Sequence, residues 1–138
     1  IFRLAEIYLN GADALNESDP SNPAVVRYLN MSRLRYGINM PEVPENLSQD
    51  EMREAIRRER RIELAFEGHR YWDVKRWMIA DKVLNTPVYG IEIENEEPLK
   101  YRRIMVERRA FSSKMNFYPI PQKVLSVASV DWPQNPLW

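Results

Sequence analysis

The chain has 138 residues, enough for one domain of modest size with a hydrophobic core. Its 20 basic and 20 acidic side chains balance, which argues against a general nucleic-acid or anionic-membrane binder, because such a protein needs a basic surplus. The lack of cysteine excludes thiol catalysis, disulfide bonds and thiolate metal sites, and no apolar run is long enough to span a membrane.

The pattern of residues 1–16 predicts a helix, and no capping residue precedes it, so the helix is expected to include residue 1. One apolar stripe follows helical spacing and consists of Ile1, Leu4, Ala5, Tyr8, Ala12 and Leu15. Phe2 and Leu9 form a second patch about 90° away on the helical wheel. A helix that is apolar on two sides needs neighbours on two sides. We therefore expect the 138 residues to end a longer polypeptide, whose upstream part contains a helix over Phe2 and Leu9.

A second helix is predicted from Pro23 to Tyr36. Asn22 has the chemistry of an N-cap, Pro23 suits the first helical position, and Gly37 suits a C-terminal cap. The expected buried face consists of Val25, Val26, Leu29 and Tyr36. Residues 1–37 are therefore expected to form a hairpin of two antiparallel helices.

A third helix is predicted after the proline-rich connector 38–47. Ser48 and Glu51 have the spacing of a capping box, and Gly68 follows the expected last residue, Glu67. The apolar stripe of this helix is expected to consist of Met52, Ala55, Ile56, Ile62 and Phe66. A short fourth helix follows, so that residues 48–80 form a helix–glycine–helix segment.

Glu59 and Glu63 fall within the apolar stripe of the third helix. A buried carboxylate without a partner costs several kcal/mol, so each must be paired, protonated or catalytic. We favour structural ion pairs with nearby arginines, because the planar guanidinium meets a carboxylate with two hydrogen bonds. The candidate partners are Arg70, Arg76, Arg33 and Arg35.

Two chemical alternatives exist for this acidic pair. A glycoside hydrolase uses two carboxylates that flank the substrate, whereas Glu59 and Glu63 lie one turn apart and point the same way. A di-metal bundle needs two Glu-x-x-His motifs, and the chain has one histidine, His69. We expect no catalytic residue and no metal, and we expect His69 to form a structural hydrogen bond after the glycine break.

Arginines and aromatic residues of this region have structural explanations. The basic residues of the run 57–61 lie away from the apolar stripe and are expected to form a solvated helical face. Tyr71, Trp72 and Trp77 are expected to be buried because of their helical context. The sequence thus offers no nucleic-acid site here.

Residues 85–138 predict a different kind of structure. Residues 88–93 and 102–107 have the composition of two short strands separated by a turn at 95–98. Prolines extend residues 117–122, a helical turn is expected at 122–127, and the tail 131–138 is irregular. Exposed aromatic side chains in such segments are the first candidates for ligand contact, namely Trp132, Tyr89, Tyr101 and Trp138.

Several separate motifs resemble the SusD/RagB family of nutrient-binding outer-membrane lipoproteins. The longest is MREAIRRERRIELAFEGHRYWDVKRW at residues 52–77. Others are RLAEIYLNGADALNE at 3–17, YLNMSRLRYG at 28–37, YPIP at 118–121 and QNP at 134–136. They follow the order of the family from residue 3 to the end, whereas residues 85–116 match poorly and Leu137 replaces a common glycine.

The resemblance implies a mainly α-helical, tetratricopeptide-like fold: a helical hairpin, a further helix pair, a short irregular or β segment and an extended tail. It implies surface exposure on the outer membrane of a Bacteroidetes-type bacterium, through a lipid anchor upstream of residue 1. It also implies glycan binding without catalysis, no cofactor, and delivery to a TonB-dependent transporter of the SusC type. A tetratricopeptide-like scaffold for protein interactions is the main alternative, and a hydrolase using Glu59 and Glu63 is a remote one.

Overall fold

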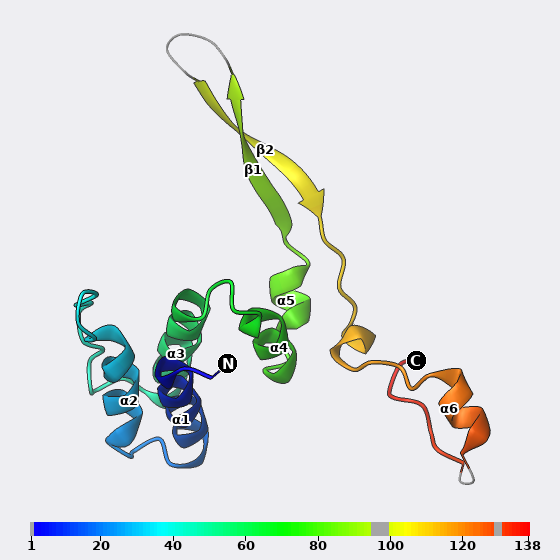
Figure 1. Ribbon diagram of the computed structural model, residues 1–138, viewed down its shortest axis with the longest axis horizontal. Coiled ribbons are helices and arrows are strands. Elements are labelled where there is room, and N and C mark those ends of the chain that lie inside the picture. Colours follow the sequence, from blue (N-terminus) through cyan, green and yellow to red (C-terminus); the bar gives the residue numbers. More distant parts are fainter. Residues whose placement is uncertain (1, 95–99, 129–130) are drawn as a thin grey trace. The chain divides into compact units, whose positions relative to one another are not determined.

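The structure is a computed structural model, and it describes residues 2–94, 100–128 and 131–138. Figure 1 labels the elements, which in chain order are α1 (Leu4–Ser18), α2 (Ala24–Arg33), α3 (Gln49–Glu63), α4 (His69–Arg76), α5 (Ala80–Leu84), β1 (Pro87–Glu94), β2 (Lys100–Arg108), the 3-10 helix η1 (Ser113–Asn116) and α6 (Gln122–Val127). The chain divides into two compact units: the helical unit, residues 1–71, and the ribbon unit, residues 72–138. The predicted mainly helical fold class, with a short β segment and an extended tail, is confirmed.

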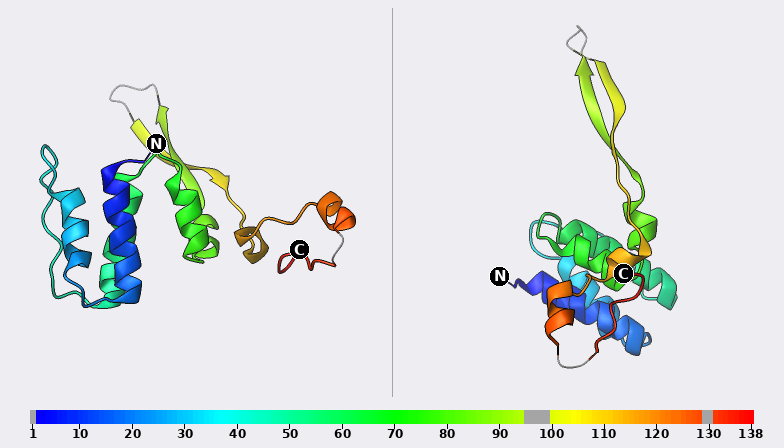
Figure 2. Two further views of the ribbon diagram at one scale, coloured as in Figure 1. Left: turned by 60° about the horizontal axis from the view of Figure 1, so that its bottom comes forward. Right: turned by 90° about the vertical axis from the view of Figure 1, so that its right-hand side faces the viewer.

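The core of the helical unit lies where α1 packs against both α2 and α3. Figure 2 shows α1 and α2 side by side as a hairpin, with α3 against α1. The buried apolar side chains come from all three helices and the residue after α3: Leu9, Ala12, Val25, Leu29, Met52, Ile56 and Leu64. This small core explains why the three helices form one unit.

The buried face of α1 differs from the predicted one. Leu9 is fully buried, whereas Leu4 is 59% exposed and Phe2 is 81% exposed, and Ile1 lies outside the described residues. The α1 face that packs in the unit also carries polar residues, among them Glu6 and Asp13, which hydrophobic spacing cannot identify. Leu9 was expected to pack against an upstream helix, whereas residues of the helical unit itself bury it.

Helices α2 and α3 end earlier than predicted, at Arg33 and Glu63. Tyr36 and Phe66 therefore lie beyond the helices and are fully exposed, although both were expected to be buried. Ile62 is also exposed, because at 100° per residue it lies about 120° from Ile56 on the wheel.

The predicted capping box of α3 is confirmed, whereas α1 begins at Leu4 and α2 at Ala24, later than predicted. In the capping box, Glu51 N donates to Ser48 Oγ at 3.3 Å and Ser48 N donates to Glu51 Oε2 at 2.9 Å. The hydrogen bonds from Ser48 hold the pKa of Glu51 below its ordinary value. Asn22 Oδ1 accepts from Ala24 N at 3.0 Å, as expected of the predicted capping residue, although α2 itself begins at Ala24.

Polar side chains join the end of α1 to the start of α3. Asn16 Nδ2 donates to Gln49 O at 3.2 Å, and Gln49 Nε2 donates to Asn16 O at 2.7 Å. One turn later, Arg53 Nε donates to Glu17 Oε1 at 2.5 Å. This hydrogen bond lowers the pKa of Glu17 and raises the pKa of Arg53.

In the ribbon unit, β1 and β2 form an antiparallel two-stranded sheet, slightly longer than predicted. The register shifts between Val88 and Tyr89, which leaves Val106 as the extra residue of a bulge. A Cβ at Gly90 would lie 2.8 Å from Val106 Cγ2, so any larger residue here would have to displace the Val106 side chain. The predicted turn at 95–98 lies outside the described residues.

The extended tail is held by side-chain amides. The side chain of Gln134 forms two hydrogen bonds with the backbone of Ile120: its Oε1 accepts from Ile120 N at 2.7 Å, and its Nε2 donates to Ile120 O at 2.9 Å. Asn135 Nδ2 donates to Tyr118 O at 2.6 Å. Trp138 Nε1 lies within hydrogen-bond distance of Lys114 O, at 2.9 Å. The predicted helical turn at 122–127 is α6.

The aromatic residues of α4 are less buried than predicted. Tyr71 is 42% exposed and Trp72 is 58% exposed, while Trp77, just after the helix, is half-buried. Lys75 is buried in their place, with its Nζ 4.1 Å from the centroid of the Tyr118 ring. This cation–π contact joins α4 to the tail within the ribbon unit.

Replacing Glu17 by Gln should lower the free energy of unfolding at neutral pH and have no effect in acid. The folded-state pKa of Glu17 lies below its ordinary value of 4.5, so its stabilisation is present above that value and is lost as the pH falls through the folded pKa. The loss is at most about 1 kcal/mol, because the pair is exposed. Urea unfolding of both proteins at stepwise lower pH measures it, and Glu42→Gln, with no ion pair among the described residues, is the control. A difference that persists in acid would contradict the pairing.

Candidate functional site

Glu59 is held by an arginine of the helical hairpin. Its carboxylate is 8% exposed, and Arg33 Nη1 lies 2.5 Å from its Oε2. Arg33 Nε also donates to Pro41 O at 2.8 Å. One guanidinium therefore neutralises the buried acid of α3 and fixes the path of the proline-rich connector.

Glu63 is held by two arginines. Arg3 Nη1 lies 2.6 Å from Glu63 Oε1, and Arg35 Nη1 pairs with the same oxygen. Arg3 Nη2 also donates to the carbonyl oxygen of Glu63, and Arg3 Nε donates to both Glu67 carboxylate oxygens at 2.9 Å. The hydrogen bonds to Glu67 and then to Glu63 raise the pKa of Arg3, and the bond from Arg3 lowers the pKa of Glu67.

The geometry of this acidic pair is that of a structural cluster. Glu63 is 7% exposed at its side chain, like Glu59, and both acids contact guanidinium groups rather than an open cleft. Carboxylates that hydrolyse a glycoside flank the substrate from two sides. Among the described residues, no group of three or more acidic or histidine side chains is placed to hold a metal ion.

The remaining predicted polar residues lie nearby or on α4. His69 Nε2 lies 3.7 Å from the buried Glu6 carboxylate, which is beyond hydrogen-bond distance. Arg76 Nε donates to Asp73 Oδ1 of its own helix at 3.0 Å, and Arg70 is half-buried at the start of α4. The structural role of Arg70 and Arg76 stays a prediction. In the basic run, Arg60 is buried and donates to Asn10 Oδ1 at 2.6 Å, so it is not part of a solvated face.

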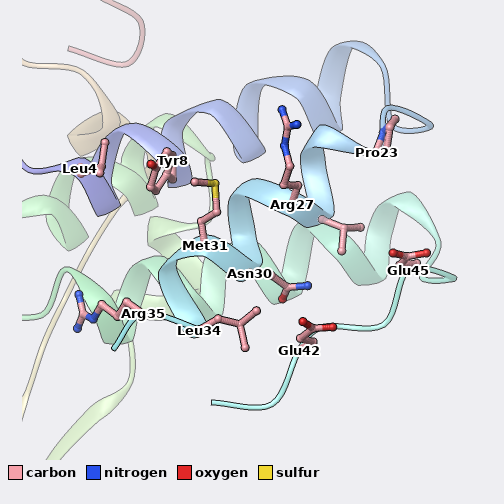
Figure 3. Close-up of a pocket in the computed structure, with 11 residues that line it drawn as sticks. Leu4, Tyr8, Pro23, Arg27, Asn30, Met31, Leu34, Arg35, Glu42 and Glu45 are labelled. Atoms are coloured by element: carbon pink, nitrogen blue, oxygen red, sulfur yellow. The ribbon is translucent and has the colours of Figure 1, made fainter. Parts of the chain in front are cut away.

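An open groove of about 770 Å³ lies on the hairpin of the helical unit (Figure 3). Leu4 and Tyr8 from α1 and Met31 from α2 supply apolar surface. Arg35, just beyond α2, and Glu42 from the connector supply charges of both signs. Apolar surface with a charged rim is the composition of many protein-binding surfaces.

The predicted ligand contacts fall on two separate segments. The strand register places Tyr89 opposite Met105 and Ile93 opposite Tyr101, so both tyrosines lie on one side of the ribbon. We call this side, with its members Tyr89, Ile91, Ile93, Tyr101, Arg103 and Met105, the ribbon face. Trp132 lies in the tail and is 53% exposed, and among the described residues no ring contact joins it to either tyrosine.

Trp138 is a poorer candidate than Trp132. Its indole nitrogen lies 3.0 Å from Phe117 O as well as close to Lys114 O. Lys114 Nζ lies 4.4 Å from the centroid of the Trp138 ring. These contacts use the side chain to hold the tail.

Two arginines of these sites were missed in the sequence. Arg3 was overlooked because its partners, Glu63 and Glu67, lie about sixty residues away and no local spacing connects them. Arg103 lies on the ribbon face with its guanidinium carbon 3.7 Å from the centroid of the Tyr89 ring. Strand alternation would have placed Arg103 beside the tyrosines, had the register been known.

The described part of the chain contains no helix long and apolar enough to cross a membrane.

The chain is similar to SusD-like protein P2 of Formosa agariphila, with 42% identity over 86 residues, 59% of this chain and 17% of that protein. SusD-like protein P25 of the same species is 42% identical over 91 residues, 64% of this chain and 17% of that protein. The chain therefore spans less than a fifth of these relatives.

Solved structures of SusD-like proteins have the same fold as this chain over the part that matches. A crystal structure of a SusD-like protein from Bacteroides fragilis matches 97% of this chain with 25% of its own, at a TM-score of 0.83 and 31% identity. A SusD homolog from Bacteroides thetaiotaomicron matches 100% of this chain with 26% of its own, at a TM-score of 0.67 and 28% identity. The model of the SusD family matches residues 1–138, and the chain belongs to this family.

Proposed function

We propose that the chain forms the C-terminal part of a cell-surface protein that binds glycans and delivers them to a TonB-dependent transporter of the SusC type. The single observation that carries this proposal is the match of the SusD family over residues 1–138. Members of this family are known as carbohydrate-binding proteins of the outer-membrane surface. The family match supports the proposed partner and location.

The proposed role is binding without catalysis. The candidate catalytic acids are Glu59 and Glu63, and arginines bind Oε2 of Glu59 and Oε1 of Glu63. A general acid or nucleophile must reach the substrate within hydrogen-bond distance. The cluster supports a different role, which is to fix the helices and the connector of the helical unit.

The ribbon unit supplies the proposed ligand contacts. Tyr89 and Tyr101 are 49% and 65% exposed on the ribbon face, and Trp132 is exposed in the tail. An aromatic ring offers a flat apolar surface to the C–H groups of a sugar, and a tyrosine hydroxyl adds a polar tip. These residues support a glycan as the ligand.

Protein binding is the second candidate function. The observation that favours it is the groove on the hairpin, because its apolar walls and mixed charges suit a polypeptide. A protein that binds no glycan and keeps a polypeptide partner in this groove would fit this alternative.

Replacing Glu63 by Gln should lower the free energy of unfolding by more than about 1 kcal/mol, because Arg3 and Arg35 lose the charge that they bind. Urea unfolding measures this loss. Glu54→Gln is the matched control, since Glu54 is exposed and pairs only locally with Arg57 among the described residues. Unchanged stability of a soluble Glu63→Gln variant would count against the structural role.

Replacing Tyr89 or Tyr101 by Ala should weaken glycan binding by roughly two- to twelve-fold, the equivalent of about 0.5–1.5 kcal/mol for one aromatic contact. Calorimetric titration of the protein with a panel of oligosaccharides measures the change. Tyr36→Ala is the control, because Tyr36 is a fully exposed tyrosine of the helical unit. A protein that binds no glycan of the panel would refute the proposed function.

A further inference from the structure

The two sides of the β1–β2 ribbon differ in chemistry. On one side, Glu92 lies opposite Arg102, and the two form an ion pair. On the other side, the ribbon face carries aromatic and aliphatic residues with one cation, Arg103. The ribbon is thus amphipathic, although neither side packs against a helix among the described residues of this unit (Figures 1 and 2).

The apolar members of the ribbon face are all exposed, from 49% at Tyr89 to 70% at Ile91. An isolated two-stranded ribbon is marginally stable in water, and a contiguous exposed apolar patch marks a binding surface. The ribbon face therefore has the properties of a surface that a ligand covers.

The guanidinium of Arg103 has a suitable position for binding an anion. Its guanidinium lies on the ring of Tyr89, and no carboxylate of a described residue pairs with it. Stacking on the ring uses the flat side of the guanidinium and leaves its N–H groups at the edge. A planar acid accepts two such N–H groups at once, which gives direction as well as attraction.

The spacing of the tyrosines limits the size of the ligand. Tyr101 lies opposite Ile93, four residues along β1 from Tyr89, which corresponds to about 13 Å. One sugar ring cannot contact both tyrosines, so a ligand that covers the face is an oligosaccharide. Arg103 lies opposite Ile91, between the two aromatic positions.

The size of the ribbon face also argues against a protein as its occupant. A stable protein interface takes about 20–30 residues from each side. The ribbon face offers the six side chains named above. A narrow strip of this kind suits a linear chain of sugar rings.

We infer that the ribbon face binds an anionic oligosaccharide, stacked on Tyr89 and Tyr101, whose acidic group is bound by Arg103. The inference rests on the proposed function and adds the class of glycan. A uronate carboxylate and a sulfate ester share the required chemistry.

Calorimetric titration of the protein with matched oligosaccharide pairs tests the inference. Each pair contains an acidic member and a neutral one of the same linkage: oligouronates against their methyl esters, and sulfated galactan oligosaccharides against desulfated ones. We expect at least one acidic member to bind about ten-fold more tightly than its neutral counterpart, as one charge-assisted interaction provides. The pair that shows the preference identifies the acid.

Variants of the ribbon connect the preference to Arg103. Arg103→Gln should abolish the preference for the acidic member, and Arg103→Lys should retain part of it because the charge remains. Arg102→Gln is the matched control: it removes a cation from the same strand on the opposite side of the ribbon and should leave the preference unchanged.

The outcomes separate the inference from the proposed function. Equal binding of acidic and neutral members, or a preference that survives in Arg103→Gln, overturns the inference and leaves glycan binding intact. An equal loss of the preference in Arg102→Gln overturns the assignment to the ribbon face. Failure to bind any glycan, acidic or neutral, overturns the proposed function and the inference together.

Discussion

Helix α3 carries two acids into a nearly dry environment, and a carboxylate there loses several kcal/mol unless cations replace the water. Three arginines from outside the helix do this for Glu59 and Glu63. Each lies in or beside a segment that regular hydrogen bonding does not fix: before α1, at the end of α2 and just after α2. The ion pairs of Glu59 and Glu63 therefore connect these less regular segments to α3.

This constraint separates the two units by their chemistry. In the helical unit, several buried polar side chains beside the apolar core are paired, as the hydrogen bonds between Asn16 and Gln49 also illustrate. In the ribbon unit, apolar side chains lie outside on a sheet of two strands. An interior of packed apolar side chains and paired polar groups suits a support, and an exposed apolar strip suits contact with another molecule. This contrast supports the proposed roles, in which the helical unit is a rigid support and the ribbon unit contacts the ligand.

Local chemistry could be predicted from the sequence, and long-range pairing could not. The capping box of Ser48 and Glu51 and the cap at Asn22 were predictable, because all the interacting atoms lie within a few residues. The strands were predictable from composition, and Tyr89 and Tyr101 were identified as candidate contacts without knowledge that they share a face. Their common face depends on register, which a bulge shifts by one residue.

The buried faces of helices were predicted less well, for a physical reason. Hydrophobic spacing assumes that buried positions are apolar, whereas α1 buries Glu6, Asp13 and Asn16 beside Leu9. Ile62 was wrongly assigned to the stripe because it lies about 120° from the buried Ile56 on the helical wheel, away from the face that Met52 and Ile56 define. Arginine partners such as Arg3 have no local signal, since their acids lie in another helix.

The amide of Gln134 gives the tail an unusual dependence on one side chain. It supplies Ile120 with the donor and the acceptor that a neighbouring strand would otherwise provide. Shortening that side chain to alanine would leave both peptide groups of an extended, proline-flanked segment without their protein partner. A segment with unpaired peptide groups is open to pairing with the backbone of another molecule, and the amide of Gln134 occupies the two groups of Ile120 through which such a strand would add.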